Sequence, residues 1–276
     1  MDNQIAAENQ QVAGRITFVV PTKNSGRTIE ACLQSITNQA NADVELIVVD
    51  NDSTDNTFEV ASELADLAVR RGPERSAQRN HGLALATGEF VVFIDSDMVL
   101  EPGIANEAVS LLTHEPALGA LVIPELAFGE GPWAPARIME KELYIGDPAV
   151  EAARVFRSDA CRSIGGYDER LNGREDWDLP DRLQLEGWGI GRVTSRIWHD
   201  EGHISLRETF SKKRYYGVGS TAGSNERATP AHRTGIAGRV RPLAKAVARN
   251  PLVGTQLVVL KTAELAGFTV GQRAGR

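Results

Sequence analysis

Two carboxylates, Asp95 and Asp97, follow directly after an apolar run and have the chemistry of a metal site. The run over 90–94 reads FVVFI and predicts a buried strand, so both side chains can reach one crevice at its end. Carboxylate oxygens are the ligands that Mg²⁺ and Mn²⁺ prefer, and such sites keep room for substrate phosphates. A metal there would stabilise the charge that develops on a diphosphate leaving group. The alternative is a plain polar turn, because Asp-x-Asp alone is a common pattern.

Two earlier apolar runs also end in polar residues. Residues 16–20 (ITFVV) and 44–49 (VELIVV) predict short buried strands that end at Pro21 and Asp50. The spacing of apolar residues predicts helices over 25–36, 57–67 and 76–86. Strands that alternate with helices indicate a parallel, doubly wound α/β sheet with right-handed crossovers. Ligands bind outside the carboxyl ends of the strands in such sheets, so the candidate site is expected where these three strands end.

The second half of the chain predicts fewer regular elements. A strand is expected over 120–123, and the Gly/Pro-rich segment 128–135 indicates a loop. A helix is expected over 179–186, with Pro180 tolerated in its first turn. Three further segments complete the prediction: an amphipathic helix over 204–216, a flexible linker over 220–238, and a helix over the last thirty residues.

Several motifs occur in a fixed order along the chain. The first two strands end in Pro21-Thr22-Lys23-Asn24 and Asp50-Asn51-Asp52-Ser53, and the segments AQRNHG (77–82) and ATG (86–88) precede the third. With Asp95-Ser96-Asp97 they resemble the donor-binding half of the family 2 glycosyltransferases, which have the GT-A fold. The segments GGYDE (165–169) and GREDWDL (173–179) look like the acceptor-side Glu-Asp motif of the same family. The resemblance runs from about Ile16 to His203.

The resemblance implies a Rossmann-like GT-A sheet, mostly parallel and flanked by helices, and an inverting, metal-dependent sugar transfer. It implies that Asp97 and His199 bind a divalent metal, Mn²⁺ or Mg²⁺. Asp176 would be the general base that deprotonates the acceptor hydroxyl, with Glu175 and Trp177 beside the acceptor. The residues implied to contact the nucleotide-sugar donor are Pro21, Thr22, Asn24, Asp50, Asp52, Arg79, Asp95 and Ser96.

Each of these roles has a structural alternative. Asp50 and Asp52 could cap the helix that follows, and the acidic residues 175–178 could simply favour a helix N-terminus. Trp177 could belong to the core. A lone histidine is usually not a ligand, and His203 competes with His199 for that role. Asp52 stands where the family often has glycine, and Lys23 is a charge close to the nucleotide, so the identity of the donor stays open.

The expected organisation has three parts. Residues 1–14 are an N-terminal extension, residues 15–219 a GT-A catalytic domain, and residues 220–276 a linker and helical C-terminal tail. Within the catalytic domain, 15–100 would bind the donor and 101–219 the acceptor. The predicted function is transfer of a sugar from a UDP-, GDP- or dTDP-sugar to a hydroxyl of a glycan, a natural product or a lipid-linked acceptor.

Two other functions stay open at this stage. A sugar-1-phosphate nucleotidyltransferase shares the sheet and the metal carboxylates, but it should have a glycine-rich loop where residues 21–26 hold a single glycine. A non-catalytic scaffold that binds nucleotide sugars is opposed by the presence of Asp97, Asp176 and His199.

Composition narrows the class of protein further. The 276 residues are 42% hydrophobic and 24% charged, which is typical of a folded protein that needs no disulfides. Only two cysteines are present, which favours a reducing compartment. Residues 1–13 lack the pattern of a signal peptide, and no long uncharged apolar run occurs. A cytoplasmic protein without a nucleic-acid partner is therefore expected.

Charge is unevenly distributed along the chain. Residues 225–276 hold nine Lys/Arg and two Glu, although the whole chain has a net charge of −7. Four basic residues, Arg239, Arg241, Lys245 and Arg249, precede an apolar stretch over 252–270. Two interpretations stay open: peripheral contact with the inner face of an anionic membrane, or a helix packed on the catalytic domain or on a second subunit as a homodimer.

Overall fold

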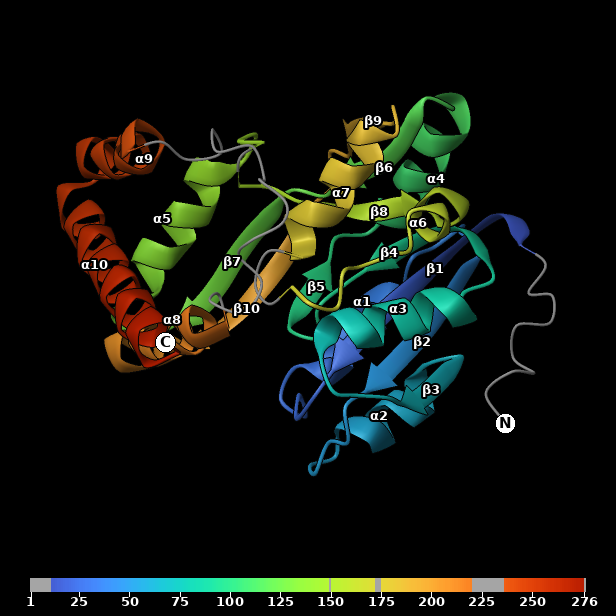
Figure 1. The fold of residues 1–276 in the computed structure, drawn as a ribbon, viewed down its shortest axis with the longest axis horizontal. Helices are drawn as coiled ribbons and strands as arrows, with labels where there is room; N and C mark the ends of the chain where they lie inside the picture. Colours follow the sequence, from blue (N-terminus) through green and yellow to red (C-terminus); the bar gives the residue numbers. More distant parts are fainter. Residues whose placement is uncertain (1–10, 149, 172–174, 220–235, 276) are drawn as a thin grey trace. The chain divides into compact units, whose positions relative to one another are not determined.

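The structure is a computed structural model, and it describes residues 11–148, 150–171, 175–219 and 236–275 (Figure 1). The elements pack into two units. The first consists of Met1–Ile123, Ala153–Glu169 and Trp177–Ile197, and the second of Pro124–Ala152, Arg170–Asp176 and Trp198–Arg276. The domain boundaries expected from the sequence stay a prediction.

The first unit contains a seven-stranded sheet in the order β3-β2-β1-β4-β8-β6-β9 (Figure 1). Strands β3, β2, β1 and β4 run parallel to one another. Strand β8 is antiparallel to both β4 and β6, and β9 is parallel to β6. The strands are β1 (Val12–Thr22), β2 (Val44–Asp50), β3 (Leu67–Arg70), β4 (Gly88–Phe93), β6 (Leu118–Val122), β8 (Ala153–Arg157) and β9 (Gly189–Arg192). The mostly parallel α/β sheet expected from the sequence is confirmed.

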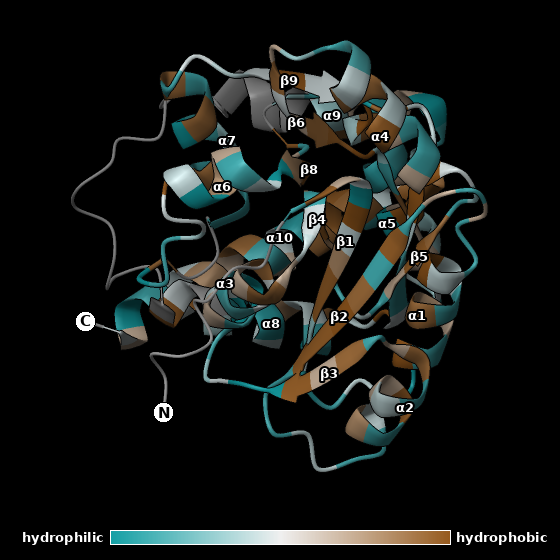
Figure 2. Ribbon diagram, turned by 90° about the vertical axis from the view of Figure 1, so that its right-hand side faces the viewer, coloured by the Kyte–Doolittle hydropathy of each residue, from teal (hydrophilic) through white to brown (hydrophobic). Residues whose placement is uncertain are grey.

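The central strands are apolar at consecutive positions because both faces of the sheet are covered (Figure 2). Phe18 and Val20 of β1 lie in one core with Leu33, and Val19 between them lies in the other core with Leu83. The first face carries α1 (Ile29–Thr37), α2 (Thr57–Leu64) and α4 (Ile104–His114). The second face carries α3 (Arg75–Leu85), α6 (Ser158–Ser163) and α7 (Glu175–Leu185). A short strand, β5 (Met98–Leu100), follows the Asp-Ser-Asp motif.

The second unit is mainly helical. Strand β7 (Glu125–Glu130) leads into α5 (Ala134–Tyr144), and β10 (Ile197–His203), its neighbour in a small sheet, leads into α8 (Leu206–Gly219). Two more helices follow, α9 (Ile236–Arg249) and the long α10 (Pro251–Ala274). Met139 of α5 and Leu257 and Leu260 of α10 share an apolar core. None of the described helices is both long and apolar enough to cross a membrane.

Helices α8 and α10 pack through glycines. A Cβ atom added at Gly267 would overlap the carbonyl oxygen of Phe210, and one added at Gly271 would overlap that of Arg214. Gly217 of α8 meets the carbonyl oxygen of Phe268 in the same way. The two backbones approach so closely that no side chain fits between them, as in small-xxx-small helix pairs.

Replacing Gly267 with leucine is therefore expected to lower the free energy of unfolding by about 3 kcal/mol, because the added side chain forces α8 away from α10. Urea denaturation followed by circular dichroism measures the change. Ala266→Leu, one residue earlier on the exposed side of α10, is the matched control and should change stability by less than about 0.5 kcal/mol. Equal stability of the two variants would show that the helices do not pack this closely.

The charges that interrupt the apolar stretch of α10 lie inside the second unit. Glu264 accepts hydrogen bonds from Arg137 Nη2 at 2.7 Å and from Lys261 Nζ at 2.8 Å. Lys261 also pairs with Glu140, which is 3% exposed. Burial alone would raise the pKa of Glu264, but Lys261 and Arg137 outweigh it and lower that pKa to about 2. These ion pairs join α5 to α10, and they compensate the charges of both Lys261 and Glu264.

Two predictions for the first unit and its helices need correction. The helix predicted over 57–67 ends at Leu64, because residues 67–70 form β3 and hydrogen-bond to β2. The helix predicted over 179–186 begins at Glu175, so Pro180 lies inside it and not in its first turn.

Two predictions for the second unit also need correction. The loop predicted over 128–135 is wrong, since β7 extends to Glu130 and α5 begins at Ala134. Gly129 is in the strand, and a glycine fits there because the carbonyl oxygen of Gly202 lies only 2.8 Å from where a Cβ would stand. The linker predicted over 220–238 overlaps α9, which begins at Ile236, and its remainder lies outside the described residues.

Candidate active site

The carboxyl ends of β1, β2 and β4 come together in the first unit. Thr22 is the register partner of Asp50, and the amide of Ile94 donates to the carbonyl of Val19. Gln78 of α3 donates from one side-chain nitrogen to the carbonyl oxygens of Thr22 (3.0 Å) and Val49 (2.6 Å). Helix α3 therefore holds the ends of two strands at a fixed spacing.

The loops after β1 and β2 are bound to each other. The Asp50 carboxylate, fully buried, accepts hydrogen bonds from the amide (2.9 Å) and the hydroxyl (2.5 Å) of Ser53. The amide of Asn24 donates to the Ser53 hydroxyl at 2.8 Å, and the Asn24 side-chain oxygen accepts from the amide of Thr54 at 2.8 Å. Asp50 thus shapes its loop, and helix α2 has Asn56 at its N-cap without a side-chain hydrogen bond.

Two of the predicted donor-binding residues have unusual backbones. Asn24 and Asp52 adopt left-handed conformations, with φ of 49° and 48°. Asn and Asp tolerate this conformation better than other non-glycine residues, and strained positions often mark ligand sites. The Asp52 side chain is exposed and lies 4.0 Å from Arg70.

The end of β1 also carries a buried polar atom that no described residue satisfies. Thr22 is 3% exposed, and its hydroxyl has no hydrogen-bond partner among the residues that the structure describes. A buried hydroxyl left in this state costs about 1–3 kcal/mol, which a ligand atom can recover. Pro21, directly before it, is buried as well.

Two arginines hold the first aspartate of the Asp-Ser-Asp motif. Asp95 accepts from Arg79 Nη2 at 2.8 Å and from Arg154 Nη1 at 3.5 Å. Burial would raise the pKa of Asp95, but Arg79 and Arg154 outweigh it and hold that pKa well below its usual range. Arg79 is only 1% exposed, and its guanidinium lies over the ring of Tyr167 at 5.1 Å. It therefore supports Asp95, and its predicted contact with the nucleotide stays a prediction.

The rest of the motif forms a tight turn. The hydroxyls of Ser96 and Ser25 are 2.7 Å apart, which ties the motif to the loop after β1. The amide of Met98 donates to the carbonyl of Asp95, so the chain turns around the half-buried Asp97. No group of three or more His, Cys, Asp or Glu side chains suited to a metal occurs in the described part of the chain. A metal on Asp97 would complete its coordination with water and substrate phosphates, as Mg²⁺ and Mn²⁺ commonly do.

Arg154, Gln78 and Asn80 are site residues that the sequence did not reveal. Asn80 accepts from the amide of Tyr167 (2.8 Å) and donates to its carbonyl (2.9 Å), which joins α3 to the loop after α6. Gln78 is buried and Asn80 half-buried in the AQRNHG segment, but polar residues on a helix are normally solvated, so the sequence did not indicate that they support the site. Arg154 stands 59 residues from its partner, in a strand that was not predicted.

Arg154→Ala is expected to weaken binding of the nucleotide sugar about ten-fold. Arg154 pairs with Asp95 beside the proposed metal site, where its positive charge would attract the diphosphate of a donor. Calorimetric titration measures the affinity, and Arg154→Lys, which keeps the charge, should recover most of it. Unchanged affinity of the alanine variant would restrict Arg154 to a structural role.

His199 lies in the second unit, on β10, beside Glu125 of β7. Its Nδ1 is 2.8 Å from Glu125 Oε1, and Lys141 pairs with the same carboxylate. Since a carboxylate only accepts, Nδ1 carries the proton, and in the neutral imidazole Nε2 is then the acceptor nitrogen. Metal-binding histidines are commonly oriented by a carboxylate in this way, so the chemistry of His199 fits a metal ligand.

The acceptor-side residues begin helix α7. Glu175 is buried, and Asp176 and Trp177 are half-buried. The Trp177 Nε1 atom is buried and has no acceptor among the described residues. Gly173 and Arg174 of the same motif lie outside the described residues.

Helix α7 is anchored just after these residues. Arg182 pairs with Asp178 at 2.7 Å and donates to the carbonyl oxygens of Ile164 (2.8 Å) and Gly166 (2.5 Å). Gly165 and Gly166 make the turn with positive φ, at 81° and 64°. The glycine pair and Arg182 therefore fix α7 against the loop that precedes the Glu-Asp motif.

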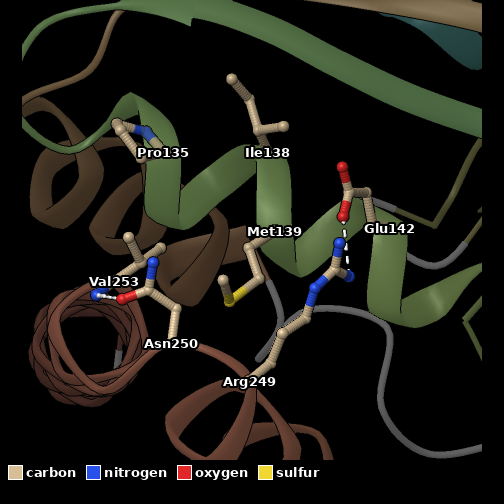
Figure 3. A pocket seen from close by; sticks show the side chains of 7 residues that line it. All are labelled: Pro135, Ile138, Met139, Glu142, Arg249, Asn250 and Val253. Atoms are coloured by element: carbon tan, nitrogen blue, oxygen red, sulfur yellow. Dashed lines mark hydrogen bonds and ion pairs between the residues drawn. The ribbon is translucent and has the colours of Figure 1, made fainter.

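An open pocket of about 430 Å³ lies in the second unit (Figure 3). The side chains of Ile138 and Met139 from α5 and Val253 from α10 make its apolar wall. At its edge Arg249 pairs with Glu142 at 2.9 Å. No predicted catalytic, donor or metal residue lines this pocket, so it is distinct from the candidate active site.

Comparison with known proteins shows the family to which the chain belongs. Residues 17–164 match the family described as Glycosyl transferase family 2. The pre-mycofactocin glycosyltransferase of Mycobacterium tuberculosis is 31% identical over 229 residues, covering 75% of this chain and 47% of that protein. The chain thus spans about half the length of this relative.

Two solved structures have a similar fold. The mannosyltransferase PcManGT from Pyrobaculum calidifontis, in complex with GDP-Man and Mn²⁺, has a TM-score of 0.62 and 20% identity over 94% of this chain and 86% of that one. The glucosyl-3-phosphoglycerate synthase from Mycobacterium tuberculosis, in complex with Mn²⁺, UDP-glucose and phosphoglyceric acid, has a TM-score of 0.52 and 21% identity over 78% of this chain and 81% of that one. Both confirm the GT-A architecture. With the family match over more than half of its length, this chain belongs to the family 2 glycosyltransferases.

Proposed function

We propose that this protein transfers a sugar, with inversion, from a nucleotide sugar to an acceptor hydroxyl, and that it requires Mn²⁺ or Mg²⁺. The observation that carries the proposal is the Asp95-Ser96-Asp97 turn at the carboxyl end of β4, next to the ends of β1 and β2. The similar structures support the donor class, since one holds GDP-Man and the other UDP-glucose, each with Mn²⁺.

On the donor side, the loops after β1 and β2 would bind the nucleoside. The buried Thr22 hydroxyl offers a hydrogen bond there, and Asp50 keeps its loop in shape through Ser53. Asp97 and His199 would hold the metal, which would neutralise charge on the departing diphosphate. Arg154 would add positive charge on the same side.

On the acceptor side, Asp176 would take the proton of the attacking hydroxyl as general base. The Trp177 indole nitrogen would donate a hydrogen bond to an acceptor oxygen, since buried indole N–H groups normally have a partner. Glu175, buried beside Asp176, would help to place the acceptor. UDP, GDP and dTDP all stay candidates for the nucleotide, and an acceptor like that of the pre-mycofactocin glycosyltransferase is one candidate among glycans, natural products and lipids.

The experiment that tests the proposal is calorimetric titration of UDP-, GDP- and dTDP-sugars with and without Mn²⁺, followed by analysis of the products. One nucleotide class should bind in a metal-dependent way, and turnover should release the nucleoside diphosphate. Release of pyrophosphate from a nucleoside triphosphate and a sugar 1-phosphate would identify a nucleotidyltransferase instead. Tight binding without turnover of any acceptor would favour the scaffold, and no nucleotide binding at all would overturn the proposal.

A further inference from the structure

Helix α10 of the second unit has an apolar outer side. Five of its large apolar residues are exposed, and Leu252 and Leu265 are exposed by 73% and 62%. The other three are Val258, Val259 and Val270, and we call these five residues the outer stripe. The stripe extends over about 27 Å at 1.5 Å per residue. The outer face of a helix that borders water is normally polar, so this face needs an occupant.

The threonines on the same side of α10 need no hydrogen bond from water, because their hydroxyls are already bonded within the helix. Thr255 donates its hydroxyl to the carbonyl of Pro251 at 2.7 Å, and Thr262 donates to that of Val258 at 2.8 Å. Thr269 donates to Leu265 in the same way at 2.8 Å. The three residues stand seven positions apart, so their methyl groups line one side of the helix. This side of α10 can therefore enter an apolar medium without losing a hydrogen bond.

The opposite side of α10 is fixed, so the outer stripe cannot turn inward. Gly267 and Gly271 lie against the backbone of α8, and Glu264 is held by Arg137 of α5. At the junction with α9, Asn250 accepts from the amide of Val253 and Arg249 pairs with Glu142 of α5 (Figure 3). Helix α10 lies along the margin of the second unit, with α5 and α8 on the other side (Figure 1).

The positive charge of the C-terminal helices indicates which partner covers the outer stripe. Residues 206–276 contain thirteen Lys/Arg and only three Asp/Glu, in a chain whose net charge is −7. Exposed basic residues occur on all three helices of this segment: Arg207, Lys212 and Arg214 on α8, Lys245 on α9 and Arg273 at the end of α10. This excess of positive charge repels a second copy of the same surface, and it attracts anionic lipid headgroups.

We propose that the outer stripe of α10 docks on an anionic bilayer, with the helix lying in the plane of the membrane. The apolar side chains enter the interface, and exposed basic residues of α9 and α10, such as Lys245 and Arg273, contact the headgroups. The inference goes beyond sugar transfer and does not depend on it, because it concerns only the surface of the second unit.

The test is flotation of the full-length protein with vesicles of phosphatidylcholine alone or with 30% phosphatidylglycerol. The protein should float with the anionic vesicles, bind neutral vesicles much less, and be released by high salt. The double variant Leu252→Gln/Leu265→Gln should bind anionic vesicles at least ten-fold more weakly. Lys245→Glu/Arg273→Glu should also reduce binding, by roughly five-fold for each positive charge removed.

Leu185→Gln is the matched control, because Leu185 is 86% exposed on α7 of the first unit and lies outside the outer stripe. It should bind vesicles like the wild type, and circular dichroism should show all variants folded. Equal flotation with neutral and anionic vesicles, or unchanged binding of the Leu252→Gln/Leu265→Gln variant, overturns the proposal. So does a dimer in analytical ultracentrifugation that this variant converts to a monomer, since the occupant would then be a second copy. Donor binding is measured separately, so failure here leaves the proposed transferase activity untouched.

Discussion

Asp97→Asn is expected to lower the rate of sugar transfer by about a thousand-fold while the protein stays folded. Asparagine keeps the size of the side chain but removes the negative charge that a hard cation requires. The ion pairs of Asp95 with Arg79 and Arg154 and the backbone hydrogen bond from Met98 to Asp95 stay available in this variant, so the turn at the end of β4 should persist. Steady-state kinetics across a range of Mn²⁺ concentrations, with calorimetric titration of the nucleotide, measures both effects.

The control for this variant is Glu63→Gln, which neutralises an exposed carboxylate on α2. It should leave the rate and the metal dependence unchanged. If Asp97→Asn binds nucleotide with the same Mn²⁺ dependence as the wild type, the metal is not on Asp97. The assignment would also be contradicted if the wild type bound nucleotide equally well without metal and Asp97→Asn lost that binding. Asp97 would then contact the donor itself.

The first half of the fold could be predicted because its strands are buried on both faces. Continuous apolar runs such as 16–20 and 90–94 leave little choice of structure, and the polar residues after them locate the edge of the sheet that binds ligands. Strands β3 and β7 escaped prediction for a different reason. Residues 67–70 continue an apolar helical pattern, so they resemble the end of a helix. Gly129 is typical of a loop, and only the fold shows that the backbone of Gly202 requires a glycine there.

The residue types of the candidate site could also be predicted, but their partners could not. Aspartates at strand ends are visible in the sequence, whereas the pairing of His199 with Glu125 joins positions 74 residues apart. Arg79 illustrates the same limit: the motif indicates an arginine near the nucleotide, and only the fold shows that it is buried against Asp95. Long-range charge pairs depend on topology, which no local pattern contains.

Asp176→Asn is expected to lower kcat by about a hundred- to ten-thousand-fold, the range that loss of a general base produces, and to leave the affinity for the nucleotide sugar unchanged. The loss of kcat without a loss of donor affinity distinguishes Asp176→Asn from Asp97→Asn, which should impair both donor binding and transfer. The half-buried Asp176 stands in the first turn of α7, which Arg182 anchors through Asp178, Ile164 and Gly166, so the amide should be held where the carboxylate was.

Rapid-quench kinetics with saturating donor isolates the transfer step of this variant, and the matched control is Glu186→Gln just beyond the end of α7, which should transfer sugar at the wild-type rate. An acceptor whose hydroxyl is more acidic should lose less rate on the Asp176→Asn change, because it needs less help to give up its proton. An equal loss with acceptors of every acidity would assign Asp176 to binding the acceptor. A variant that transfers at the wild-type rate would move the general base elsewhere in the chain, and the acidic residues at the start of α7 would then serve only to stabilise the helix N-terminus.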